Sequence, residues 1–287
     1  MDINNKQCLI LRSFRLLLLI GASDLTHASS WVDVHEDPPK KVTYSSLKNN
    51  TDAPEEDYYF DGPSSIATLS FGPAWSTPGK TQTFFLQSNV QKSYISTNGA
   101  SAIADGELFY GFERPLRSKM RAQLGIAIAG ATNVGLYGDI LEDADNDFNN
   151  YFYKYNVNHA HVGFKAKLIK ELQSPYEPYF STSVALGFNH SYNFSITPKI
   201  YQEVPAPYFQ SNTALAVTYT LGAGVQKRVD KNWIIGLGYE FADWGTSNLS
   251  AAPGQTLGGG LYMNHIYTNE VQLSITYQPK LLQMDGK

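Results

Sequence analysis

From residue 65 onward, apolar and polar residues alternate with a period of two. The clearest case is the stretch 120–129, whose apolar set is Met120, Ala122, Leu124, Ile126 and Ile128. The residues between them are Arg, Gln, Gly and Ala. Because successive side chains of a strand point to opposite faces, this alternation predicts a strand with one apolar face.

Eight stretches of the chain show this alternation, which predicts an all-β fold. They are 67–75, 107–113, 120–129, 159–168, 180–188, 215–226, 233–241 and 270–277. The links between them are alternately short (114–118, 171–175, 229–232) and long (76–102, 131–153, 193–212, 246–265). Short turns at one end and long loops at the other are typical of membrane barrels. We therefore predict an eight-stranded antiparallel up-and-down transmembrane β-barrel over 65–280, with four long external loops.

The size of the residues on the two faces predicts which face meets lipid. Alternation alone also fits a soluble barrel that holds its apolar set inside. In this chain the polar set is rich in Gly, Ala and Ser, which suit a crowded interior. The apolar set is bulky, and it is aromatic at strand ends, as a lipid-facing surface requires. We therefore expect the apolar face to point outward.

Charged residues of the polar set are expected to pair inside the barrel. The acidic members are Glu107, Glu113, Glu240 and Glu270, and the basic members are Arg121, Lys165, Lys167 and Arg228. The interior of an eight-stranded barrel is just wide enough for side chains to fill it. We therefore predict a plugged lumen, with a polar-lined pore as the alternative.

Composition and charge narrow the classes of function. Only 17% of the residues are charged, against roughly 25% in an ordinary soluble domain, and 13% are aromatic. The 22 basic and 26 acidic residues give a net charge of −4, which provides no basic surface for nucleic acid. The single cysteine, Cys8, allows neither an internal disulfide nor a thiolate metal site.

The two ends of the chain differ from the barrel region. Residues 1–28 have the layout of a signal peptide, with basic residues, an apolar run over 16–22 and a small residue, Ala28, at the expected cleavage point. An N-terminal membrane anchor is the alternative. Residues 29–64 hold eight acidic and three basic residues and four prolines, which predicts a flexible acidic segment. Residues 281–287 are expected to form a C-terminal tail.

Three segments resemble the small bacterial outer-membrane β-barrel proteins of the OmpA-transmembrane and opacity-protein type. They are 67–75 (ATLSFGPAW), 238–245 (GYEFADWG) and 271–277 (VQLSITY). The resemblance covers about 65–279 and implies an outer-membrane barrel, but its motifs are architectural and imply no reaction. The C-terminus departs from the family, whose members commonly end on an aromatic residue, because ten residues follow Tyr277.

Four histidines fall near the strand ends that join the long loops, at the expected outer rim. They are His159, His161, His190 and His265. His159 and His161 share a face at a spacing that can chelate a metal, but no carboxylate or thiol in the sequence completes a ligand set. We expect two polar residues of the lumen that are hydrogen-bonded to neighbours.

Two further patterns resemble enzyme sites of outer-membrane proteins. His190 and Ser191, with Asn193, resemble part of the site of lipid A deacylases, but adjacent strand residues point to opposite faces. Asp243 and His265 resemble part of the site of outer-membrane proteases, which have ten strands and a paired acidic motif that is absent here. We expect Asp243 to be a rim residue that accepts hydrogen bonds from the loop backbone.

The stretch 138–148 contains five carboxylates and no basic residue. Asp143, Asp145 and Asp147 have the initial spacing of a calcium loop, but Phe148 stands where Gly is needed and Lys154 where Glu is needed. We expect a solvated acidic loop. A weak divalent-cation site, or contact with cation-bridged lipopolysaccharide, is the alternative.

These observations together predict an outer-membrane barrel of a Gram-negative bacterium that acts through its surface loops, in envelope integrity or in contact with a host. We expect a monomer that contacts outer-membrane lipids and lipopolysaccharide and possesses no catalytic residues, no cofactor and no metal. A narrow porin-like channel is the first alternative. A lipid A-modifying enzyme or a protease is the second.

Overall fold

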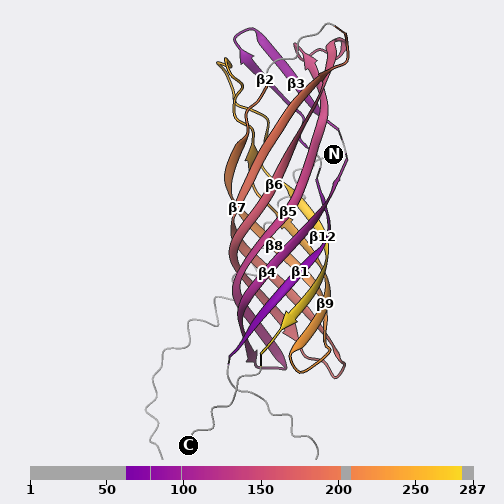
Figure 1. Ribbon diagram of the computed structural model, residues 1–287, viewed down its shortest axis with the longest axis vertical. Coiled ribbons are helices and arrows are strands. Elements are labelled where there is room, and N and C mark those ends of the chain that lie inside the picture. Colours follow the sequence, from indigo (N-terminus) through magenta and orange to yellow (C-terminus); the bar gives the residue numbers. More distant parts are fainter. Residues whose placement is uncertain (1–62, 78, 98, 202–207, 280–287) are drawn as a thin grey trace, which may run out of the picture. The chain divides into compact units, whose positions relative to one another are not determined.

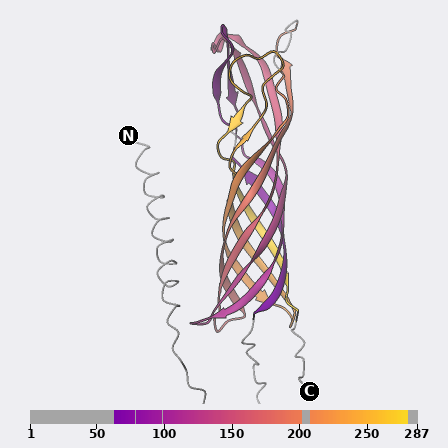
Figure 2. The ribbon, with the colours of Figure 1, turned by 90° about the vertical axis from the view of Figure 1, so that its left-hand side faces the viewer.

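The computed structural model describes residues 63–77, 79–97, 99–201 and 208–279, which form a closed antiparallel barrel (Figures 1 and 2). Its eight strands are β1 (Ser64–Ser76), β4 (Ser101–Leu116), β5 (Met120–Glu142), β6 (Asn149–Lys170), β7 (Tyr176–Pro198), β8 (Asn212–Arg228), β9 (Trp233–Asp243) and β12 (Tyr267–Tyr277). Each strand pairs with the next, and β1 closes the ring against β12 from Ala67–Tyr277 to Ser76–Thr268. The predicted fold class is confirmed.

The lower part of the barrel, which ends in the short turns, has an apolar exterior and a polar interior. Leu124, Ile126 and Ile128 of β5 are more than half exposed, whereas Arg121 and Gln123 of the same strand are buried. The other strands follow the same rule. A soluble domain does not combine an apolar exterior with a polar interior, whereas a barrel surrounded by hydrocarbon requires this arrangement. The predicted orientation of the two faces is therefore correct. We call this part of the barrel the belt, and it lies in lipid.

The connections at the two ends of the barrel differ as expected. Ser118 and Lys119 have positive φ angles of 65° and 55° in the tight turn between β4 and β5. At the other end the strands run beyond the belt, and β5, β6 and β7 reach 22 or 23 residues (Figure 1). The expected loop 131–153 is therefore largely strand, and only its tip, with the short 3-10 helix Asn146–Phe148, is a loop.

Two small hairpins were not predicted. β2 (Gln82–Gln87) pairs with β3 (Val90–Ser96) inside the first long connection, and β3 also pairs with the upper end of β5. β10 (Ser247–Asn248) pairs with β11 (Tyr262–Met263) inside the last one. We call the structure above the belt the crown. It comprises the β2–β3 hairpin, residues 208–210, segment 244–266 and the upper ends of β5, β6 and β7 (134–142, 149–157, 194–198).

The interior of the crown is apolar, which reverses the polarity of the belt. Buried members of this core include Tyr94, Leu136, Ile140, Tyr153, Val157, Ile196, Phe209, Trp244, Leu249, Leu261 and Ile266. Water rather than hydrocarbon surrounds this part of the barrel, so the ordinary rule of an apolar inside applies to it. The crown is therefore a folded cap with a core of its own.

Two β-bulges produce part of this reversal. In β5, Thr132 and Asn133 stand opposite the single residue Asn158, so that inward positions change from odd to even numbers. In β7, Asn193 has a φ of 54° and supplies the extra residue, after which Phe194 and Ile196 point inward. A bulge adds one residue to one strand, and one residue exchanges the two faces.

The predicted signal peptide (1–28), almost all of the acidic segment (29–64) and the C-terminal tail (281–287) lie outside the described residues. Within the described part of the chain, none of the helical structure is long and apolar enough to cross a membrane.

Candidate functional site

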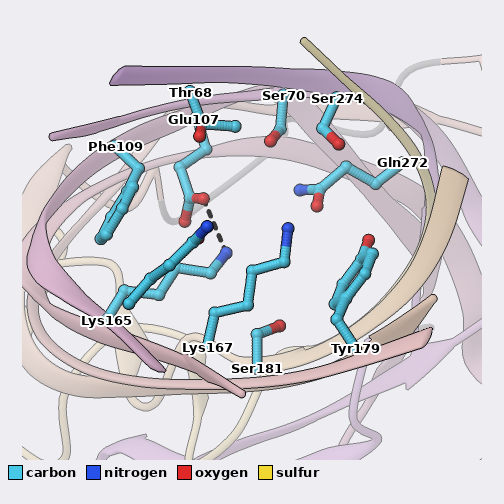
Figure 3. Close-up of a pocket in the computed structure, with 11 residues that line it drawn as sticks. Thr68, Ser70, Glu107, Phe109, Lys165, Lys167, Tyr179, Ser181, Gln272 and Ser274 are labelled. Atoms are coloured by element: carbon cyan, nitrogen blue, oxygen red, sulfur yellow. Dashed lines mark hydrogen bonds and ion pairs between the residues drawn. The ribbon is translucent and has the colours of Figure 1, made fainter. Parts of the chain in front are cut away.

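The centre of the lumen is occupied by an ion-pair network around Lys165 of β6. Its ammonium group lies 2.6 Å from Glu107 Oε1 (Figure 3) and 2.8 Å from Glu240 Oε2, so that it links β4 and β9 across the barrel. All three side chains are at least nine-tenths buried. The sequence predicted these three residues as interior partners, and the structure brings them together.

A second network closes the lower end of the lumen around Arg121 of β5. The guanidinium contacts Glu113 at 2.8 Å, Glu171 at 3.0 Å and also Glu177. Of these three, only Glu113 was among the acidic residues predicted to pair inside the barrel. Glu171 and Glu177 lie in and after the short turn 171–175, where strand alternation gives no signal.

Three of the predicted lumen charges form no ion pair inside the barrel. Lys167 donates to Gln226 Oε1 at 2.7 Å and lies 3.9 Å above the ring of Tyr179. Buried Glu270 has no hydrogen-bond partner for Oε1 among the described residues. The prediction that Arg228 lies in the lumen is wrong, because its exposed guanidinium donates hydrogen bonds to the carbonyl of Lys231 and to Gln278 at the turn.

Little space remains between these side chains. The cavity beside Lys165 and Lys167 has a volume of about 30 Å³, and its walls are the side chains shown in Figure 3, which are polar except for Phe109. Such a space admits only a few water molecules. The lumen of the belt is therefore filled, as predicted.

Trp244 closes the lumen at its upper end. It follows β9 directly, is 1% exposed, and stacks on His159 with ring centroids 4.4 Å apart and planes 6° apart. Asn189 of β7 fixes this position because its Nδ2 donates to the carbonyls of Trp244 (2.8 Å) and Thr246 (2.7 Å). Sequence reasoning missed Trp244 because this residue falls between the predicted strand 233–241 and the predicted long loop 246–265.

His159 and His161 lie below Trp244 and bond to their neighbours, as expected. His159 Nδ1 donates to Asn189 Oδ1 at 2.7 Å, so its Nε2 accepts from His161 Nδ1 at 3.0 Å. Both ring nitrogens of His159 are thereby used. No group of three or more potential metal-ligating side chains occurs within the ranges that the structure describes.

His190 and Ser191 point to opposite faces of β7. His190 Nδ1 bonds to Thr213 Oγ1 at 2.9 Å on the outside, while buried Ser191 bonds to Ser247 Oγ at 2.7 Å on the inside. A base and a nucleophile placed in this way cannot exchange a proton. The similarity of this segment to deacylases is thus one of sequence only.

Asp243 and His265 do meet, at the outer rim. Fully buried Asp243 accepts from His265 Nδ1 at 2.7 Å, from the Tyr219 hydroxyl at 2.6 Å and from the amide of Gly245 at 2.8 Å. The last bond is the expected contact with the loop backbone. Because Gly245 and His265 stand at the two ends of segment 244–266, one carboxylate anchors the whole segment that carries Trp244.

The acidic stretch 138–148 is less isolated than its sequence indicates. Asp139 pairs with Lys199 at 2.8 Å and Glu142 pairs with Lys92 at 2.6 Å, so the expectation of an uncompensated charge is wrong for these two residues. Their bases come from distant segments. At the tip, Asp145 accepts from the amide of Asp147 at 3.0 Å and thereby caps the 3-10 helix.

Hollows open at the surface of the crown where the structure describes it. One, of about 500 Å³, lies between β2–β3, Tyr208 and 253–255; another, of about 440 Å³, lies along β10 and β11. The third, of about 370 Å³, lies on the outer wall of β5, β6 and β7.

Inside the crown, burial is the main cause that raises the pKa of the Tyr94 hydroxyl. The hydroxyl itself has no partner among the described residues.

No protein-family model matches this chain, and no curated protein matches its sequence. Several solved structures are similar to it. Neisserial surface protein A is 12% identical with a TM-score of 0.38, covering 76% of this chain and 99% of its own. Ail of Yersinia pestis, in complex with the heparin analogue sucrose octasulfate, is 13% identical with a TM-score of 0.31, covering 75% and 99%.

The outer-membrane protease OmpT of Escherichia coli is also similar, at 8% identity with a TM-score of 0.42, covering 75% of this chain and 97% of its own. Identities and TM-scores of this size carry no functional argument. The barrel of the present chain is assigned from its own strand pairing and from the polarity of its two faces.

Proposed function

We propose that this protein is a closed outer-membrane barrel of a Gram-negative bacterium that acts through its crown, in contact at the cell surface or in support of the envelope. The observation that carries this proposal is the filled lumen beneath a folded crown. Lys165, Arg121 and Trp244 occupy successive levels of the interior, whereas the exposed surface above the belt is large and hollowed.

A planar lipid bilayer tests the closed lumen directly. We expect the purified barrel to insert without stable stepwise currents, because each level of the lumen is blocked by buried side chains. Stable unitary currents from the unmodified protein would overturn the proposal in favour of the narrow channel. Flotation of the barrel with phospholipid vesicles after a carbonate wash is the matched check of insertion, since a soluble barrel would stay behind.

We further propose that the protein is not an enzyme. The pair Asp243–His265 is the arrangement closest to a catalytic one, because a buried carboxylate orients a half-exposed imidazole. Its geometry supports an anchoring role instead, since the carboxylate already accepts three hydrogen bonds and ties both ends of segment 244–266. Peptide and lipid A hydrolysis by the wild type should not exceed that of a His265→Ala variant.

The partners and the processing of the chain complete the proposal. The apolar exterior of the belt supports contact with outer-membrane lipids, and the crown supports contact with lipopolysaccharide or with host ligands. Cleavage of residues 1–28 as a signal peptide and a monomeric state belong to the same proposal. The mass of the mature protein tests the cleavage, and its sedimentation in detergent tests the monomeric state.

A further inference from the structure

The hollow on the outer wall of the crown has the composition of a saccharide site. Two aromatic residues, Tyr137 of β5 and Phe152 of β6, are each 53% exposed in its wall. Between and beside them lie side chains that bond to hydroxyl groups, namely those of Thr97, Asp139 and Thr197. Exposed aromatic rings pack against the apolar C–H faces of sugar rings, while such polar groups bond to the sugar hydroxyls.

Strand pairing holds this hollow in a fixed geometry. Tyr137 stands opposite Lys154, which in turn stands opposite Ser195, and one row higher Asp139, Phe152 and Thr197 are aligned in the same way. The upper row is also braced. Lys199 Nζ lies 2.8 Å from Asp139 Oδ1, 2.6 Å from Asn149 Oδ1 and 4.2 Å from the centroid of the Phe152 ring.

One cation of the hollow has no counter-charge. Lys154 is exposed in the lower row and forms no ion pair with any residue that the structure describes, whereas Lys199 is already neutralised by Asp139. The hollow therefore carries a net positive charge at its lower edge. An ammonium group in this position is a point-charge partner for a phosphate.

The height of the hollow identifies the source of its ligand. On β6 the outward apolar series ends at Ala160, and the polar residues Asn158, Asn156 and Lys154 follow it. Lys154 lies six residue steps along the strand from Ala160, and a strand rising ~3.3 Å per residue at a tilt of ~40° places Lys154 about 15 Å above the belt. The hollow faces sideways from there, toward the head groups that surround the barrel.

We propose that this hollow holds the phosphorylated saccharide head of a glycolipid from the leaflet around the barrel, a lipid of the lipopolysaccharide type. Tyr137 and Phe152 pack against the sugar rings, Asp139 and Thr197 bond to their hydroxyls, and Lys154 pairs with a phosphate. The proposal rests on the membrane location proposed above. The lipid anchor keeps the saccharide at a high local concentration, so a modest intrinsic affinity is enough.

The full-length tagged barrel is inserted into phospholipid vesicles that contain lipopolysaccharide and is then purified from them. Mass spectrometry measures the amount of lipopolysaccharide that the purified barrel retains. We expect Tyr137→Ala/Phe152→Ala to retain about tenfold less than the wild type. Lys154→Gln should lose the preference for phosphorylated over dephosphorylated lipopolysaccharide. The control, Phe85→Ala, removes a crown aromatic that is 47% exposed outside the hollow and should retain the wild-type amount.

Each other result decides against the assignment. Equal retention by the double variant and the control overturns the hollow as the site, and an unchanged phosphate preference in Lys154→Gln overturns the role of the cation. If the soluble saccharide released from its lipid binds as tightly as the intact glycolipid, the ligand is a free saccharide instead. Vesicle flotation of every variant separates these outcomes from failure of membrane insertion, which would remove the proposed function itself.

Discussion

The indole ring of Trp244 lies parallel to the imidazole of His159, with 4.4 Å between the two ring centroids. Trp244 belongs to the connection after β9, whereas His159 belongs to the upper lumen face of β6. The stack therefore joins the crown to the belt at the point where the interior changes from apolar to polar. It also makes Trp244 the lid of the lumen.

Replacement of Trp244 by alanine should destabilise the barrel. The substitution removes a fully buried aromatic ring and its stacking contact with His159, which we expect to lower the free energy of unfolding by ~3–5 kcal/mol. Urea unfolding in vesicles, followed by the mobility of folded and unfolded protein on gels, measures the effect. Tyr201→Ala is the control, because Tyr201 is 93% exposed and its loss should change stability by less than ~0.5 kcal/mol.

Conduction should require the loss of all three levels that block the lumen. Variants that carry only Trp244→Ala, Lys165→Ala or Arg121→Ala each keep the other two levels, so each should remain silent in a planar bilayer. The triple variant should show small unitary currents. Currents in any single variant would mean that only one level closes the lumen.

Loss of Lys165 should be more damaging than loss of the entire network. Lys165→Met leaves Glu107 and Glu240 buried without their counter-charge, which we expect to lower the free energy of unfolding by ~3–5 kcal/mol. The triple variant with Glu107→Gln and Glu240→Gln should recover most of that loss. The same urea titration measures both variants, and a triple variant as unstable as the single one would contradict the explanation.

Asp243 should control the mobility of segment 244–266. In Asp243→Ala the Gly245 amide, the Tyr219 hydroxyl and His265 lose their common acceptor, so both ends of the segment are released. We expect faster hydrogen exchange and faster surface proteolysis within 244–266 in intact cells. His190→Ala is a suitable control, since His190 bonds outside the lumen to Thr213 and contacts no part of that segment's anchor.

The bulge at Asn193 should tolerate glycine and reject a β-branched residue. Asn193 has a φ of 54°, which costs a β-branched residue ~1–2 kcal/mol. We therefore expect Asn193→Val to lower the free energy of unfolding by about that amount and Asn193→Gly to be nearly neutral. A neutral Asn193→Val would indicate that the bulge shifts to a neighbouring position.

The alternation of side chains was enough to predict the belt, because one physical rule governs all eight strands there. It predicted the strand number, the outward face and the presence of Lys165, Glu107 and Glu240 among the charges that pair in the interior. The crown could not be predicted in the same way. Tyr94, Leu136 and Trp244 point into a core surrounded by water, so the rule reverses, and two bulges exchange the faces without any motif of their own.

The contacts of the acidic stretch were beyond the sequence for another reason. Lys92 and Lys199 lie dozens of residues from Glu142 and Asp139, and only the register of β3 with β5 and of β6 with β7 brings these charges together. The spacing of residues along the chain does not reveal that register. The hollow beside Tyr137 and Phe152 depends on it as well.

The single extra residue at Asn193 limits how this protein can change in length. A deletion there would turn Phe194 and Ile196 toward water and Ser195 and Thr197 into the aromatic core, although no residue type had been altered. Deletions of two residues would leave the facing intact. Related sequences should therefore vary between this point and the tip of β7 in even steps, a pattern that comparison of lineages can reveal.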